Sequence, residues 1–139
     1  MKTTYYLLTT IILLTITSCA TTKNSKLYGN SWQLEYISGT KIAFEGLYPN
    51  KKPQITFNKE KNKVQGNNSC NGYSANYTIK DSSIYFSEPG PSTMMYCGEG
   101  EQAFLKMMEK VNRFSFDDNG KLNLMLDDVT VLRFKKVTK

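Results

Sequence analysis

Residues 70–97 read CNGYSANYTIKDSSIYFSEPGPSTMMYC, and this stretch decides the fold. Across residues 73–79 apolar and polar side chains alternate, and a turn at Asp81 leads to a second apolar run at residues 84–86. Alternation of this kind predicts strands, and so short a connection makes them antiparallel. The Pro-Gly-Pro motif at residues 89–91 ends the strand pattern, because proline has no N–H to donate to a sheet.

Cys70 and Cys97 are expected to form a disulfide. The chain has three cysteines, and the third, Cys19, lies at the end of a leader segment. A domain exported behind such a leader folds in an oxidising compartment, where two remaining cysteines normally pair. Closing a loop of this length should stabilise the fold by about 3 to 4 kcal/mol.

The N-terminus has the pattern of a targeting segment. Lys2 is followed at residues 5–16 by a mostly apolar run without charge, which suits a signal peptide and is too short to span a bilayer. Residues 16–20, Ile-Thr-Ser-Cys-Ala, resemble the lipobox of bacterial lipoproteins, in which the cysteine receives a lipid. We therefore expect residues 1–18 to be a lipoprotein signal peptide and Cys19 to be lipidated. The alternative is an ordinary secretory signal beside a stray cysteine.

The segment that follows is expected to be a lipidated, flexible tether over residues 19–28, because most of its residues are small or polar. The folded domain is then expected at residues 29–139. A lipid on Cys19 would make a membrane the first partner. Ala20 stands where the sorting pattern of lipoproteins would place a retaining aspartate, which favours the outer membrane of a bacterial cell envelope.

Composition limits the function. A chain of 139 residues suits one small domain, and its net charge of +6 arises from lysines scattered along the sequence. We therefore expect no nucleic-acid binding, and we expect a monomer. The sequence has no histidine, so the usual general base and metal ligand is missing. Without an acid–base pair to replace it, we expect a protein that is not an enzyme, with no catalytic residues, no cofactor and no metal.

The rest of the chain predicts more strands and one helix. Alternating segments lie near residues 32–37, 53–57, 63–67, 113–117, 121–126 and 129–135. At about residues 99–112 the apolar side chains recur at helical spacing instead, which predicts an amphipathic helix. We predict a mainly β fold, α+β at the margin: a small antiparallel β-barrel or half-barrel closed by that helix. A flat sheet with the helix on one face is the alternative.

Taken together, these features resemble the META/HslJ domain family of bacterial envelope proteins. The specific parts of the likeness are the Cys70-Asn71 pair and the Thr93-Met94-x-x-Cys97 run. Other matching positions are Gly29, Trp32, Leu34, Ile55-Thr56-Phe57, Gly66, Tyr73, Tyr77, Glu101-Gln102, Phe104-Leu105, Leu122, Leu124, Leu132 and Phe134. Ser69 departs from the glycine that members often have, and residues 41–52 form an irregular insertion.

The resemblance implies a small, barrel-like β fold with one helix, an envelope location and often a lipid anchor. Family members are associated with heat shock and with resistance to an antibiotic. No enzymatic activity is established for the domain, so the family supplies no catalytic residues to carry over.

Several groups of side chains near the turns are candidates for a site. A recognition surface for a peptide or glycan could form from Asn67, Asn68, Asn71 and Asn76, which otherwise serve as turn residues. We interpret as core filler, rather than as a Cu(I) site, the residues Met94, Met95, Met107, Met108 and Met125. We interpret the aspartate pairs at residues 117–118 and 127–128 as turn residues rather than a Ca²⁺ site.

The expected function is that of a non-catalytic, lipid-anchored envelope domain. It would contribute to envelope integrity or stress tolerance by contacting an unknown envelope protein or the cell wall. The alternative is a barrel that holds a small hydrophobic ligand among inward-facing aromatic side chains. These are Trp32, Tyr36, Phe57, Tyr73, Tyr77, Phe86, Phe114, Phe116 and Phe134. Their bulk favours a filled interior over a hollow one.

Overall fold

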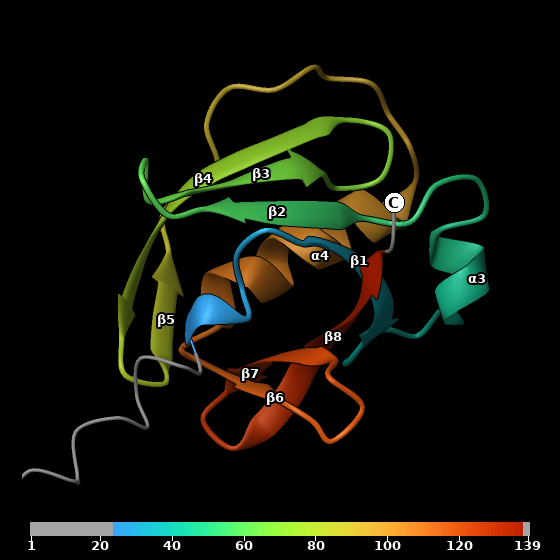
Figure 1. The fold of residues 1–139 in the computed structure, drawn as a ribbon. Coiled ribbons are helices and arrows are strands. Elements are labelled where there is room, and N and C mark those ends of the chain that lie inside the picture. The colour runs from blue at the N-terminus through green and yellow to red at the C-terminus, as the bar shows by residue number, and fades with distance from the viewer. Residues whose placement is uncertain (1–23, 138–139) are drawn as a thin grey trace, which may run out of the picture.

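The structure is a computed structural model that describes residues 24–137. In chain order its elements are β1 (Ser31–Ile37), α3 (Phe44–Leu47), β2 (Gln54–Asn58), β3 (Lys63–Asn67), β4 (Gly72–Lys80), β5 (Ser83–Phe86), α4 (Glu99–Lys110), β6 (Arg113–Phe116), β7 (Leu122–Leu126) and β8 (Val129–Val137). Each strand pairs antiparallel with the next, and β8 pairs with β1. The sheet therefore closes into the predicted barrel (Figure 1).

The strand pairing that closes the barrel is extensive between β1 and β8 and very short between β5 and β6. β1 pairs with β8 from Ser31 to Ile37, whereas β5 and β6 share one opposed pair, Ser83 and Arg113. The short β5–β6 pairing lies where the chain leaves the sheet to form α4 and then returns to it. α4 contacts both β5 and β8, so the helix supplies packing where the strands supply little.

The interior of the barrel is filled with side chains. Phe104 of α4 lies between Tyr73 of β4 and Phe134 of β8, with ring centroids 5.5 and 6.5 Å away. Phe86 and Phe116 are partly buried against this core. Its largest fully buried members are Trp32, Phe104, Phe114, Phe134, Leu27, Leu34, Ile55, Ile84, Met108, Leu122, Leu124 and Leu132. Because close packing of this kind leaves no room for a ligand, the hydrophobic-ligand alternative loses its expected site within residues 24–137.

A β-bulge corrects the predicted face of one aromatic residue. Trp32 and Leu34 of β1 face the core as expected, but the pairing of β1 with β8 shifts register between Leu34 and Tyr36. An extra residue reverses the alternation that follows it. Ile37 therefore takes the inward position, and Tyr36 is 39% exposed, with the Arg133 guanidinium 5.2 Å from its ring centroid.

The first described residues belong to the folded domain, which corrects the tether boundary predicted at residues 19–28. Leu27 is fully buried in the core, and Trp32 Nε1 donates a hydrogen bond to its carbonyl oxygen at 3.0 Å. Tyr28 bridges to β2. The sequence places the boundary too late because Leu27 and Tyr28, between a polar run and Gly29, are too short a stretch to show a period.

The signal peptide predicted at residues 1–18 and the lipidation site Cys19 lie outside the described residues. Within residues 24–137, no helix has both the length and the apolar character needed to cross a membrane.

α4 runs over Glu99–Lys110, two residues shorter than predicted. Gly98, at φ 87°, makes the turn into the helix in a backbone region that favours glycine. Glu99 and Glu101 occupy the first turn, where the helix dipole favours negative charge.

The insertion at residues 41–52 folds onto the start of α4. It contains the short helix α3, and its Leu47 and Tyr48 are buried. Tyr48 Oη donates a hydrogen bond to the Gly100 carbonyl oxygen at 2.8 Å. Gly100 is itself buried, and a Cβ there would collide with the Leu47 carbonyl oxygen. The insertion is therefore packed, although its sequence has no clear period.

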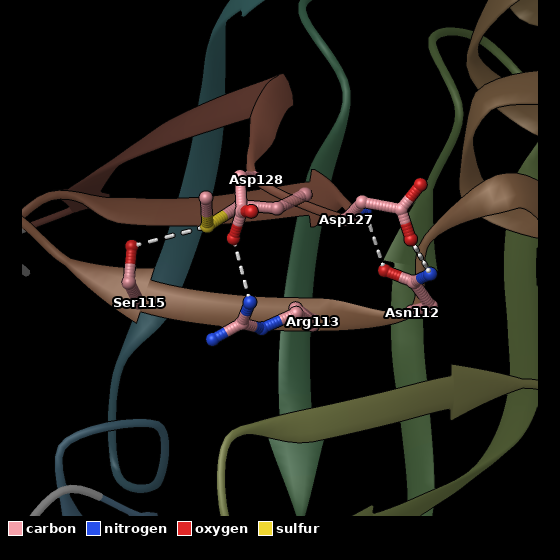
Figure 2. Close-up of polar contacts among 6 residues, drawn as sticks. Asn112, Arg113, Ser115, Asp127 and Asp128 are labelled. Carbon is pink, nitrogen blue, oxygen red and sulfur yellow. Dashed lines mark hydrogen bonds and ion pairs between the residues drawn. The ribbon is translucent and has the colours of Figure 1, made fainter.

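The aspartates at residues 127–128 hold the β7–β8 turn beside β6 (Figure 2). Asp127 Oδ1 accepts from Asn112 Nδ2 at 2.8 Å, and Asn112 Oδ1 accepts from the Asp127 backbone N–H. Asp128 pairs with Arg113 at 2.6 Å. In the other pair, Asp117 accepts from backbone N–H groups of its own turn. These contacts support the interpretation of both pairs as turn residues.

Candidate functional site

A disulfide joins the entrance of β4 to the entrance of α4. Cys70 and Cys97 are bonded, with Cα atoms 6.2 Å apart, as the cysteine count predicted. Between them the chain leaves β5 and crosses residues 87–98 without regular secondary structure before α4 begins. In Figure 1 this loop arches over β4 and descends to the start of α4. The disulfide thus fixes the far end of the loop to the sheet.

Asn71 holds the same loop through its side chain. Its Oδ1 accepts from the Met95 backbone N–H at 3.0 Å and from Thr93 Oγ1 at 2.9 Å. Its Nδ2 lies 2.6 Å from the Met95 carbonyl oxygen. The amide thus pairs with both backbone groups of Met95, as a neighbouring strand would. Asn71 is 2% exposed, and these bonds explain the neighbouring Cys70-Asn71 and Thr93-Met94-x-x-Cys97 motifs.

Glu101, in the first turn of α4, completes a set of side-chain hydrogen bonds that holds the loop; we call Asn68, Asn71 and Glu101 the clamp. Its Oε2 accepts from Asn71 Nδ2 at 2.8 Å, and its Oε1 accepts from Asn68 Nδ2 at 2.8 Å. Sequence reasoning placed Glu101 in the helix but missed this role, because 30 positions separate it from Asn71. Glu101 is half-buried; a carboxylate that is partly removed from water needs hydrogen-bond donors, and the two asparagines supply them.

The four asparagines do not form the predicted recognition surface. Asn68 and Asn71 are buried inside the clamp. Asn67 is half-buried, and its side-chain amide donates to the Ser69 carbonyl oxygen at 2.9 Å. Asn76 is exposed further along β4, where it pairs with Lys63 of β3. Asn67 thus has the local turn role that was the alternative, whereas the side chains of Asn68 and Asn71 bond residues that are far away in the sequence.

The loop instead exposes three consecutive large side chains. Met94 is 99% exposed, Met95 65% and Tyr96 89%; we call these residues the apolar ridge. Their exposure corrects the interpretation of Met94 and Met95 as core filler. Of the other methionines in that set, Met108 is buried and Met107 packs against the core. The ridge lies immediately before Cys97 and is held by Asn71 through Met95.

Two surface hollows flank the ridge and share Tyr96 as a wall. One, of about 580 Å³, lies between the loop and β4 and includes Asn71, Tyr73 and Leu105 in its lining. The other, of about 440 Å³, lies between the ridge, α4 and the insertion; we call it the lysine pocket. Its lining includes Lys41, Ile42, Leu47, Tyr96, Glu99, Ala103, Lys106, Met107 and Lys110.

The titratable groups near the clamp have structural roles. Burial raises the pKa of Tyr73 well above its ordinary value of 10.0, and the Glu109 carboxylate raises it further. Burial likewise raises the pKa of Tyr48. The sulfur atoms of Cys70 and Cys97 and a carboxylate oxygen of Glu101 lie within 4.8 Å of one another, close enough to hold a metal ion. Because both sulfur atoms are bonded in the disulfide, neither is free to act as a thiolate ligand. The arrangement is thus suited to holding a loop.

Comparison with known proteins identifies the family. The META domain family profile matches residues 25–139, which includes the clamp, the ridge and the lysine pocket. A solved structure titled "NMR structure of the protein from Burkholderia xenovorans" is 25% identical, with a TM-score of 0.62 over 83% of this chain and 86% of that one. No curated protein matches the sequence. The chain belongs to the META domain family.

Proposed function

We propose that this chain is a non-catalytic, lipid-anchored domain of the bacterial cell envelope, attached to the outer membrane through Cys19. It binds an envelope protein or the cell wall through the apolar ridge, and this contact contributes to envelope integrity or stress tolerance. The observation that carries the proposal is the exposure of Met94, Met95 and Tyr96 on a loop held by the Asn71 side chain and by the disulfide at Cys97.

The ridge has the physical character of a contact site. Single exposed apolar residues are common, but contiguous large ones mark surfaces that bind. Methionine adapts its shape to a partner, and tyrosine is enriched where proteins meet. Because the disulfide and Asn71 already order the loop, binding would cost less conformational entropy than ordering a free loop.

The position of the ridge agrees with attachment through the N-terminus. In Figure 1 the first described residues and the loop of residues 87–98 lie on opposite sides of β2, β3 and β4. A lipid on Cys19 would therefore hold the domain by one side and leave the ridge accessible from another. This arrangement favours a partner other than the anchoring membrane itself.

Site-specific photocrosslinking in intact cells tests the proposal. A photoreactive amino acid replaces Tyr96 in the full chain, and the matched control places it at Tyr85, an exposed tyrosine on β5. We expect a discrete adduct from position 96 and none from position 85. The same photoreactive amino acid is also placed at position 94. If neither position 94 nor position 96 gave an adduct, the proposed contact would be refuted.

The anchor and the stress role need separate measurements. Labelling with a radioactive fatty acid should mark the wild type and be lost in Cys19→Ser. A strain lacking the chain should become more sensitive to heat or to an envelope-active antibiotic. Wild type should restore tolerance and a Met94→Ser/Tyr96→Ser variant should not, although both reach the same cellular level. Equal restoration of tolerance by the variant would show that the stress role does not depend on the ridge.

A further inference from the structure

We propose that the partner presents an acidic peptide segment to the lysine pocket, with its carboxylate against the lysines and a neighbouring apolar side chain on the pocket floor. This inference rests on the proposed function, since it names the chemistry of the partner at the same surface. Three features of the pocket support the inference: its positive charge, its apolar floor and its position next to the ridge.

The pocket carries a surplus of unpaired positive charge. Lys41, Lys106 and Lys110 line it, against one carboxylate, Glu99. Within residues 24–137 the ion pairs involve Arg113, Lys121 and Arg133, and none involves these three lysines. Lys106 and Lys110 are four residues apart on α4, so they share a face of the helix and repel each other. A bound carboxylate would relieve that repulsion.

The floor between the lysines is apolar. Leu47 is buried, and Ala103 and Met107 are partly buried against the core. Ile42 of the insertion is exposed at the rim. A hollow of about 440 Å³ falls within the size range of small-molecule pockets, which suits one or two side chains of a partner. A fully solvated anion would gain nothing from such a floor, whereas an acidic residue beside an apolar one would use both features.

The pocket is continuous with the ridge, because Tyr96 forms part of both. A polypeptide that covers the ridge would reach the lysines without leaving the surface. This continuity favours a peptide segment over an unconnected small anion.

Charge reversal in the crosslinking experiment tests the inference in the full chain. Lys106→Glu/Lys110→Glu removes the cations, and Lys135→Glu/Lys136→Glu on β8 makes the same change in net charge away from the pocket. Two exposed ion pairs correspond to roughly a 2- to 30-fold change in affinity. For the first variant we expect the adduct yield from position 96 to decrease by a factor within that range. For the second variant we expect the yield to stay near the wild-type value.

A designed probe tests the carboxylate directly. The fluorescent peptides Ac-Gly-Leu-Glu-Glu-Phe-Gly and Ac-Gly-Leu-Gln-Gln-Phe-Gly differ only in charge, and their binding to the purified full-length protein in detergent micelles can be compared by anisotropy. The acidic peptide should bind more tightly, and the Lys106→Glu/Lys110→Glu variant should abolish the difference.

The outcomes separate the two proposals. An adduct at position 96 that is indifferent to charge reversal, or equal binding of the two peptides, would overturn the acidic partner and leave the proposed function intact. An adduct with a lipid or with a second copy of this chain would also overturn the acidic partner. Absence of any adduct would instead refute the contact itself.

Discussion

Replacing Asn71 tests whether its side chain is what holds the loop. In Asn71→Ala the Met95 backbone groups can regain water, but Glu101 keeps only Asn68 as a donor. A hydrogen bond to a charged group contributes about 1.5 to 3 kcal/mol, and neutral ones contribute about 0.5 to 1.5 each. Because the loop is near solvent, we expect a total loss of about 2 to 4 kcal/mol in the free energy of unfolding, measured by urea denaturation of the oxidised protein.

Asn71→Asp sharpens the same test through its pH dependence. The new carboxylate would stand where Asn71 Nδ2 lies, 2.8 Å from Glu101 Oε2, so at neutral pH this variant should be less stable than Asn71→Ala. Two carboxylates so close share a proton, and their folded pKa rises above the unfolded values near 4. The folded variant therefore binds more protons than its unfolded chain, and its stability rises as the pH falls through that raised pKa.

The matched control for both variants is Asn76→Ala, an exposed asparagine on β4. It should change stability by less than about 0.5 kcal/mol. Hydrogen exchange at the Met95 amide should accelerate in Asn71→Ala and not in the control, since Asn71 Oδ1 accepts from that amide. Wild-type stability in Asn71→Ala, or a difference between the two Asn71 variants that does not vary with pH, would refute the clamp.

Three further predictions concern the packing around the site. Leu27→Ala should lower the free energy of unfolding by about 2 to 5 kcal/mol, because Leu27 is fully buried. Lys26→Ala should leave that free energy nearly unchanged in the same urea denaturation. Equal effects of the two substitutions would support a domain that begins at residue 29. Gly100→Ala should lower the thermal midpoint, contrary to helix propensity, because a Cβ there meets the insertion backbone; a raised midpoint would show that the insertion is not packed. Tyr73 stays neutral in the folded chain but ionises near its ordinary pKa of 10.0 when unfolded, so its contribution to stability is full below pH 10 and falls above it by about 1.4 kcal/mol per pH unit. Tyr73→Phe should reduce that slope of stability against pH, and an unchanged slope would contradict the assigned burial.

Local periodicity was enough to predict most elements of the fold. Alternation marked the strands from Trp32 onward, and helical spacing marked α4. It failed at Tyr36, where a one-residue bulge inverts the face, and at Leu27, where two adjacent apolar residues are too few to show a period. Both failures arise because burial is decided by contacts with distant strands.

The candidate site was harder to predict because its parts are far apart in the sequence. The cysteine count predicted the disulfide, but neither composition nor spacing connects Asn71 with Glu101. Methionine commonly fills cores, so the sequence predicts burial for Met94 and Met95. Their exposure follows from the Pro-Gly-Pro break and the Asn71 hydrogen bonds, which hold residues 92–96 on the surface.

The measurement that most directly links the clamp to function is the yield of the position-96 adduct in cells that carry Asn71→Ala. If a pre-ordered ridge binds the partner, the yield should fall severalfold at equal protein level, while Asn76→Ala retains the wild-type yield. Equal yields in wild type and Asn71→Ala, together with accelerated exchange at Met95 in that variant, would contradict the central claim that the partner binds a ridge ordered in advance by Asn71.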